Sequence, residues 1–289
     1  MKKAVVFGGT GFLGGYLVRE LEKRGYWVLP CDIYNPQNHP NFVYCDIMDR
    51  SKVSDIITAD IDFVFNLAGF ANLDTAIHNP IRAIELNVIG NMHVLEGCMN
   101  KGIKRFVYAS SAYAMSNKGS FYGISKLSSE KIVEEYGKRY GLSYTILRYG
   151  SVYSEMNFDN NYIYQLVKKA VKEQSINHNG DGEELREYVH AQDAAKLSVD
   201  VIESEQFENE HVILTGLEKM KRLDLFKMIK EMLNDEVEIT LEHSEYKGHY
   251  KMTPYSFEPT RSRKLVANPH IDMGQGLLDC IKAVYKSDE

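Results

Sequence analysis

The chain has 289 residues, a formal net charge of −6, 44% hydrophobic residues and 26% charged residues. These values are ordinary for a globular protein with a large core, and the length fits one large domain or two modest ones. The acidic balance without a long basic block argues against a nucleic-acid surface, and no apolar run reaches the roughly 18 to 20 residues of a membrane span. We therefore expect a soluble, cytoplasmic protein with no nucleic-acid or membrane partner.

Neither the cysteines nor the histidines form a recognisable disulfide or metal pattern. The four cysteines are scattered without a CxxC pair, and the nine histidines include no HExxH motif. A disulfide framework is not needed in a chain of this size. We expect reduced thiols that fill core space, and no metal site.

Over the first 150 residues, short apolar runs alternate with amphipathic stretches. Buried strands are expected at residues 4–7, 27–31, 42–45, 63–67, 106–109 and 144–147. Helical spacing follows the first run, where Leu13, Leu17 and Leu21 recur every four residues. This alternation predicts right-handed crossovers and an α/β fold with a doubly wound parallel sheet of the Rossmann type.

This alternation of apolar runs and amphipathic stretches ends after Arg148, where the chain becomes polar and leaves the expected sheet. It returns with a short strand, a helix over 193–202 and a strand at 211–214, and then leaves the sheet for good. The expected domains are a sheet domain of 1–150 plus 186–216, and a smaller, discontinuous C-terminal substrate domain of 151–185 plus 217–289. Ligands of such folds bind at the carboxyl ends of the strands, which places a cleft between the two domains.

A glycine-rich loop, Gly8-Gly-Thr-Gly11-Phe-Leu-Gly14, follows the first strand and opens the first helix. Its glycines permit a tight turn and let backbone N–H groups approach a pyrophosphate at the positive helix end. Asp32 lies just past the second strand, where a carboxylate can bond the adenine ribose hydroxyls and repel a 2′-phosphate. A loop carboxylate without a ligand is the alternative for Asp32. The pattern favours NAD over NADP and makes the sheet domain the NAD-binding domain.

Two further strand ends carry candidate cofactor-binding residues. Asp46-Ile47 follows the third strand and Leu67-Ala68-Gly69 the fourth, and carboxyl ends of parallel strands share one edge of a sheet. We expect the first pair to lie beside the adenine and the second beside the pyrophosphate. The candidate cofactor-binding residues are Gly8, Gly11, Phe12, Leu13, Gly14, Asp32, Asp46, Ile47, Leu67, Ala68, Gly69, Tyr122 and Lys126.

Tyr122 and Lys126 are one helical turn apart, and Ser110 and Ser111 close an apolar strand just upstream. At this spacing the ammonium can lie beside the phenol and lower its pKa from about 10 towards neutrality. A tyrosine tuned in this way can take and return a proton, and a hydroxyl can orient the reacting oxygen. A solvent-facing Tyr-Lys pair is the alternative. The candidate catalytic residues are Ser111, Tyr122 and Lys126.

Taken in order, these motifs resemble the extended short-chain dehydrogenase/reductases, specifically the NAD-dependent epimerase/dehydratase family that acts on nucleotide sugars. The resemblance covers about the first 216 residues. It is carried by Gly8-x-x-Gly11-x-x-Gly14, Asp46-Ile47, Asn66-Leu-Ala-Gly69, Asn87-Val-Ile-Gly90, Ser110-Ser111, Tyr122-x-x-x-Lys126 and Arg186-Glu-Tyr-Val-His190-x-x-Asp193.

The resemblance implies a role for each candidate catalytic residue. Tyr122 would be the general acid/base, Lys126 would hold the nicotinamide ribose, and Ser111 would bond the reacting sugar hydroxyl. A 4-keto sugar that turns over before hydride returns gives the C4 epimer, as in UDP-glucose/UDP-galactose 4-epimerases. Two family helices, around 81–100 and 122–140 here, form a dimer interface, so a homodimer is expected. The implied pathway is the synthesis of surface polysaccharide or glycoconjugates.

Other residues bear on the substrate, expected to be a nucleotide-diphosphate sugar. Ala112-Tyr113 stands where similar dehydratases have Asp-Glu and similar decarboxylases have Glu in the second place, which favours redox chemistry at one carbon without elimination. Tyr113 packs against either the sugar or the core. Arg186 resembles the arginine that grips the substrate diphosphate; a salt bridge to Glu183 or Glu184 is the alternative. The candidate substrate-binding residues are Ser111, Tyr113, Ser151 and Arg186.

Several departures leave the reaction open. Ser111 and Tyr122 are only eleven positions apart, which shortens a loop beside the sugar, and Ser151 replaces a common Asn. No second substrate arginine stands at 247–251, where a lysine or His249 could replace it; Tyr255 and Arg261 are weaker candidates. The alternatives to an epimerase are an NAD-dependent nucleotide-sugar dehydrogenase or 4-ketoreductase, and a non-catalytic NAD-sensing or binding protein. His190 and Asp193 are expected to cap or pin the following helix.

Overall fold

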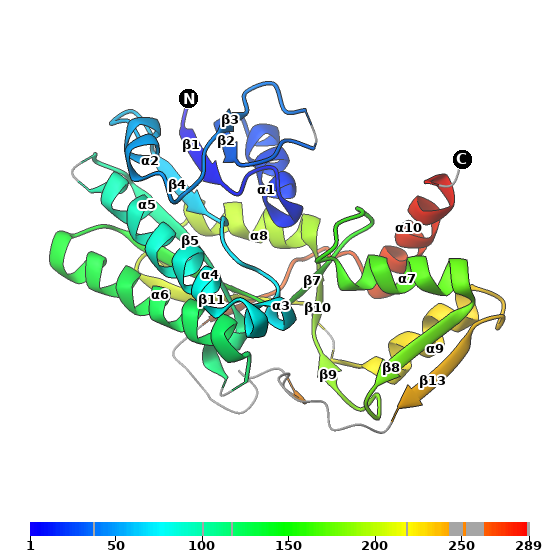
Figure 1. Ribbon diagram of the computed structural model, residues 1–289. Coiled ribbons are helices and arrows are strands. Elements are labelled where there is room, and N and C mark those ends of the chain that lie inside the picture. Colours follow the sequence, from blue (N-terminus) through cyan, green and yellow to red (C-terminus); the bar gives the residue numbers. More distant parts are fainter. Residues whose placement is uncertain are drawn as a thin grey trace.

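The computed structural model describes residues 1–36, 38–99, 101–116, 118–217, 219–242, 251–252 and 263–287. Within them a large sheet flanked by helices lies beside a smaller group of helices and short strands (Figure 1). His249, Tyr255 and Arg261 lie outside the described residues. No helix in the described ranges is long and apolar enough to cross a membrane.

The large sheet has eight strands, all parallel, in the order β3-β2-β1-β4-β5-β6-β11-β14. The chain order runs outward from β1 in one direction and from β4 in the other, which makes the β1–β4 boundary the switch point where such folds bind ligands. The predicted doubly wound Rossmann sheet is confirmed. Its strands are β1 (Lys3–Phe7), β2 (Trp27–Asp32), β3 (Val43–Tyr44), β4 (Phe63–Asn66), β5 (Arg105–Ser111), β6 (Tyr144–Tyr149), β11 (Glu210–Leu214) and β14 (Arg263–Leu265).

Strand β14 is a correction to the sequence prediction, which had the chain leave the sheet for good after residue 216. Residues Arg263–Leu265 instead pair in parallel with β11 and form the sheet edge. The run Arg263-Lys-Leu265 is short and mostly exposed, so it carries too little apolar periodicity to be recognised as a strand.

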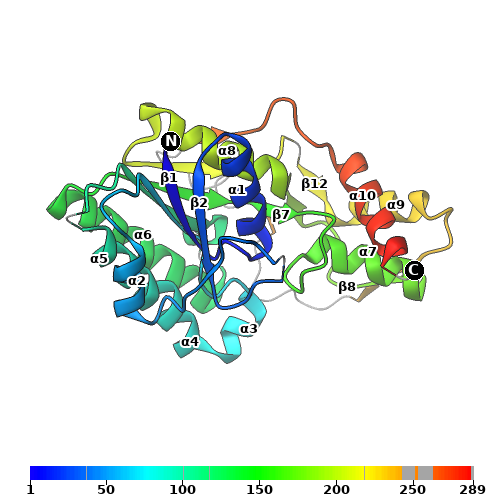
Figure 2. The ribbon, with the colours of Figure 1, turned by 90° about the horizontal axis from the view of Figure 1, so that it is seen from above.

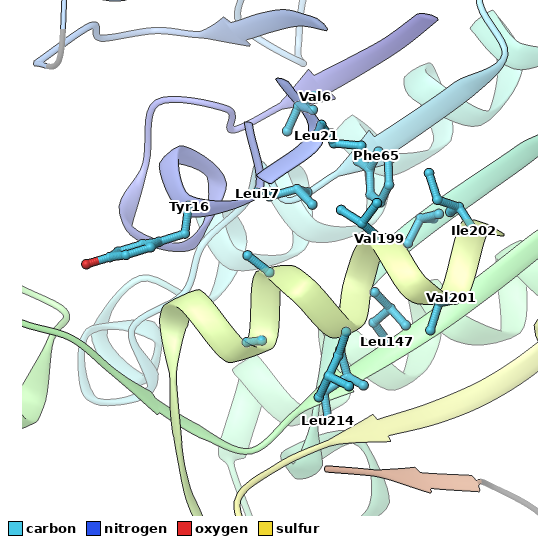
Figure 3. Packing of buried hydrophobic residues seen from close by; sticks show 14 of the residues in the cluster. Val6, Tyr16, Leu17, Leu21, Phe65, Leu147, Val199, Val201, Ile202 and Leu214 are labelled. Atoms are coloured by element: carbon cyan, nitrogen blue, oxygen red, sulfur yellow. The ribbon is translucent and has the colours of Figure 1, made fainter. Parts of the chain in front are cut away.

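Helices cover both faces of the sheet (Figure 2). One face carries α1 (Phe12–Lys23) and α8 (Ala191–Glu203). Figure 3 shows how Leu17 and Leu21 of α1 meet Val199 and Ile202 of α8 over strand residues such as Phe65. The other face carries α2 (Arg50–Ile56), α3 (Leu73–His78), α4 (Pro80–Ile84), the π-helical turn η1 (Glu85–Gly90), α5 (Asn91–Cys98) and α6 (Ser120–Tyr140).

A separate hydrophobic cluster holds the smaller part together. It joins apolar faces of its helices, with Val167, Phe226 and Leu277 fully buried. Its elements are α7 (Tyr162–Glu173), β8 (Ser175–Asn179), α9 (Arg222–Met232), β13 (Glu238–Glu242) and α10 (Met273–Lys286). Short strand pairs connect it to the large sheet: β7 (Ser151–Tyr153) with β10 (Tyr188–His190), and β9 (Leu185–Arg186) with β12 (Met220–Lys221). The exact domain boundaries stay a prediction.

Candidate active site

A pocket of about 430 Å³ opens at the carboxyl ends of β1, β2, β4, β5 and β6. Every residue predicted to bind the cofactor lines it, and so does Ser111. The pocket spans the switch point between β1 and β4, where the two halves of the sheet diverge. The structure therefore brings residues from more than a hundred positions apart in the sequence into one site.

The glycine loop forms a cradle that larger residues could not form. Gly8 has φ +78°, and a Cβ on it would lie 2.6 Å from the Ala68 nitrogen; a Cβ on Gly14 would lie 1.9 Å from the Gly8 oxygen. Helix α1 starts at Phe12 with no side chain bonded to its first N–H groups and no acidic residue in its first turn. These free donors and the close packing fit a bound diphosphate.

Asp32 ends β2 with its carboxylate in the pocket. Its Oδ2 accepts from the Thr10 N–H at 3.3 Å and its Oδ1 from the Ile33 N–H at 2.8 Å. These bonds fix the carboxylate and leave acceptor capacity for ribose hydroxyls. The arrangement fits the adenine ribose of NAD and disfavours a 2′-phosphate.

The next strand ends complete this wall. Ile47 is buried and packs closely against Gly90, where a Cβ would lie 2.6 Å from the Ile47 Cδ1. The loop after β4 is held by Asn87 of η1, whose Oδ1 accepts from Phe70 N–H at 2.7 Å and whose Nδ2 donates to Phe70 O at 3.0 Å. The π-helical turn thus supports the part of the pocket formed by Leu67, Ala68 and Gly69.

Lys126 lines the pocket but is almost fully buried, with 6% of its surface exposed. Its Nζ donates to the Ala109 carbonyl at 2.9 Å and lies 5.1 Å from the ring centre of Tyr108 and 5.9 Å from that of Tyr122. Burial lowers the pKa of Lys126 to about 8, and the negative charge of Glu130 acts in the opposite direction. The ammonium is therefore held by a carbonyl and two aromatic faces.

Glu130, one turn beyond Lys126 on α6, is fully buried and anchors this helix to the sheet. Its carboxylate receives two bonds from the Arg148 guanidinium, at 2.9 and 2.7 Å, and one from the Ser110 hydroxyl at 2.5 Å. The sequence analysis missed this network. The signal was a carboxylate at helical spacing from Lys126 and an arginine at the end of the sixth apolar run.

The predicted substrate residues other than Ser111 lie outside the pocket lining. Tyr113 packs its ring edge-on against Tyr122, with centroids 6.1 Å apart. Ser151 starts β7 and donates its N–H to the Glu187 carbonyl at 3.3 Å. Arg186 is 2% exposed in β9 and donates to the Leu185 carbonyl at 2.9 Å. Their substrate roles stay predictions.

The expected structural role of His190 and Asp193 is confirmed. His190 caps α8, with Nδ1 accepting from Gln192 N–H at 3.2 Å. Asp193 Oδ2 accepts from Ile271 N–H at 2.6 Å and pins the later chain to α8. Pocket residues that were not predicted from the sequence are Ile33, Cys45, Ala71, Arg82, Leu86, Ala109, Tyr149, Gly150, Val152 and Asn160.

A family model described as the NAD dependent epimerase/dehydratase family matches residues 4–215. The chain therefore belongs to this family, and the prediction of NAD as its cofactor is confirmed. Among curated proteins, the chain is 28% identical to a putative UDP-glucose 4-epimerase of Methanocaldococcus jannaschii, covering 94% of this chain and 95% of that protein. It is 25% identical to a UDP-N-acetyl-alpha-D-glucosaminuronate decarboxylase of Bacillus cytotoxicus, with 97% of each covered.

Two solved structures share the fold over nearly the whole chain. The UDP-glucose 4-epimerase of Thermotoga maritima with UDP-glucose has a TM-score of 0.84 at 24% identity, covering 99% of this chain and 100% of that one. The UDP-glucuronic acid 4-epimerase of Bacillus cereus with UDP-glucuronic acid and NAD has a TM-score of 0.85 at 21% identity, with 99% of each covered.

The cradle yields a first prediction. Gly14→Ala should raise the Kd for NAD at least roughly tenfold, because its methyl group would displace the Gly8 carbonyl and open the loop. Isothermal titration calorimetry measures this. Gly25→Ala is the control: at this remote turn, with φ +81°, a Cβ adds backbone strain but meets nothing within 4 Å, and the variant should bind NAD as the wild type does. Equal affinity of both variants would contradict the cradle.

Proposed function

We propose that the protein is an NAD-dependent epimerase that inverts C4 of a nucleotide-activated sugar. The observation that carries this proposal is that Ser111, Tyr122 and Lys126 line the same pocket as the NAD-binding residues, with the Lys126 ammonium 5.9 Å from the Tyr122 ring centre. A proton acceptor, a cation and a hydroxyl donor converge there, at the end of the pocket opposite Asp32 in the sheet order.

In the proposed mechanism, Tyr122 removes the proton of the sugar C4 hydroxyl as C4 is oxidised, and the 4-keto sugar then turns over in the site. Tyr122 returns the proton to the C4 oxygen when hydride comes back to the opposite face of C4. Bound NAD supplies the chemistry of accepting and returning a hydride at that carbon. Ser111 donates a hydrogen bond that orients the reacting oxygen. Lys126 supplies the positive charge that stabilises the Tyr122 phenolate, and Ala109 fixes its position.

The residues after Ser111 favour epimerisation over elimination. Ala112 and Tyr113 carry no carboxylate, so the acid and base that elimination or decarboxylation needs are missing from this position. The Methanocaldococcus relative and the Thermotoga neighbour are named UDP-glucose 4-epimerases, which supports a UDP-sugar as substrate. We further propose that the protein is cytoplasmic, which fits its four free, buried cysteines. A UDP-sugar substrate fits a role in glycoconjugate or polysaccharide synthesis.

We also propose that the protein forms a homodimer through α4, η1 and α6. Helices α4 and α6 pack side by side on one face of the sheet (Figure 1). Their outer surface exposes large apolar side chains, an arrangement typical of protein interfaces. These side chains are Ile81, Ile89, Phe121, Ile124 and Leu127.

The test of the proposed activity is the Tyr122→Phe variant. Loss of the phenol should lower kcat by roughly 10²- to 10⁴-fold, because the sugar hydroxyl then has no base, while NAD remains bound. Interconversion of UDP-glucose and UDP-galactose by nuclear magnetic resonance measures it, with UDP-glucuronic acid and UDP-N-acetylglucosamine as further substrates. Lys118→Ala on the loop before α6 is the control.

Full activity in Tyr122→Phe would refute the mechanism. Stoichiometric change at about 340 nm with added cofactor would instead identify a dehydrogenase or ketoreductase. NAD and nucleotide-sugar binding without turnover in the wild type would identify a binding protein. A 4-keto-6-deoxy product would show elimination.

The lowered pKa of Lys126 predicts an alkaline limit on activity. The folded protein should lose this proton as the pH rises through about 8, so kcat should fall above that pH. Between about pH 8 and the ordinary lysine pKa the unfolded chain keeps the proton, so the contribution of Lys126 to the free energy of unfolding should increase with pH. In Lys126→Arg, whose guanidinium does not titrate here, the residual rate should not fall. A wild-type rate that stays flat to pH 10 would contradict the shift.

The proposed interface predicts that Ile124→Glu shifts the protein from dimer to monomer, because it buries a charge against a second copy. Light scattering during size-exclusion chromatography measures the mass. Leu278→Glu, at an exposed apolar position on α10, should leave the dimer intact. A monomeric wild type would exclude the interface.

A further inference from the structure

The cofactor pocket is lined by one cationic side chain, Arg82, that has no role in the proposed mechanism. Among the described residues lining the pocket, the charged side chains are Asp32, Asp46, Arg82 and Lys126. Lys126 is buried and committed to the Ala109 carbonyl. Arg82 is different, because its side chain is 47% exposed and its ion pair with Glu85 is a surface contact of 3.4 Å. Such exposed pairs contribute little stability, so the guanidinium can change partners easily.

Arg82 lies on a helix face that forms part of the pocket wall. Leu86, one turn further along α4 and η1, lines the same pocket, so the i, i+4 face of this segment points towards the ligand space. Next to Leu86, Asn87 holds the loop after β4 through both of its bonds to Phe70. Helix α4 is therefore fixed against the loop that carries Leu67 to Ala71.

That loop in turn touches the glycine cradle. Gly8 approaches Ala68 so closely that a Cβ would lie 2.6 Å from its nitrogen. A continuous set of contacts thus leads from the diphosphate cradle through Ala68 and the Asn87 clamp to the helix segment that carries Arg82. The Arg82 side chain, about half exposed, is among those that line this pocket.

The ligand chemistry supplies the reason for a cation here. The diphosphate of NAD carries two negative charges, whereas the cradle offers only backbone dipoles, and the carboxylates of Asp32 and Asp46 add negative potential. A guanidinium matches two phosphate oxygens in a bidentate geometry. We propose that Arg82 exchanges Glu85 for the diphosphate of bound NAD and closes over it. This inference rests on the NAD pocket of the proposed function and does not depend on the reaction catalysed there.

The test measures binding by titration calorimetry with the full chain freed of nucleotide. Arg82→Ala should raise the Kd for NAD and for ADP by roughly tenfold, and the loss should shrink as salt increases. Its affinity for adenosine, which has no phosphate, should be unchanged. Glu85→Gln, which releases the guanidinium, should tighten NAD and ADP binding. Both positions are exposed, and thermal unfolding checks that each variant folds as the wild type does.

Three results would overturn the inference: unchanged NAD and ADP affinity in Arg82→Ala, an equal loss for adenosine, or a selective loss for UDP, which would assign the guanidinium to the substrate. None of these bears on catalysis. The epimerase proposal fails separately, if the wild type binds NAD with normal affinity and converts no nucleotide sugar.

Discussion

The site depends on keeping a charged ammonium at Lys126 almost without water. With 6% of its surface exposed, this lysine loses most of its hydration, and its pKa falls to about 8 as a result. The Ala109 carbonyl and the faces of Tyr108 and Tyr122 replace part of what water would supply. Because no solvent screens it, this positive charge can stabilise a phenolate that develops on Tyr122.

The buried carboxylate of Glu130 makes this arrangement rigid. It lies one turn beyond Lys126 on α6 and is bonded to Arg148 at the end of β6 and to Ser110 at the end of β5. One side chain thus fixes the catalytic helix against both strands whose ends form the pocket. A buried ion pair of this kind is weak evidence for added stability, but loss of one partner leaves an uncompensated charge. We interpret it as the element that sets the distance between Ser111 and the α6 residues.

Much of the fold and of the cofactor wall could be predicted from the sequence, because the information is local. Buried parallel strands read as apolar runs, and the residues that follow them meet at one edge whatever the details of packing. This rule placed Gly8, Asp32, Asp46 and Leu67 in a single pocket. What the rule could not supply was contact between side chains on different elements, such as Glu130 with Arg148, or the return of β14 to the sheet. Ser151 and Arg186 lie off the pocket lining because they stand in the short strands that lead to the smaller part, whose packing no local pattern encodes. Tyr113 lies off it because its ring packs against Tyr122.

The proposed mechanism depends on the protonation of one lysine, and a direct titration tests it. Nuclear magnetic resonance of the protein carrying ¹³C-labelled lysine, with Lys126→Met to assign the signal, measures the pKa of this ammonium without reference to catalysis. We predict a midpoint near pH 8, well below the ordinary lysine value of 10.5. A midpoint at the ordinary value would show a hydrated ammonium and contradict the account.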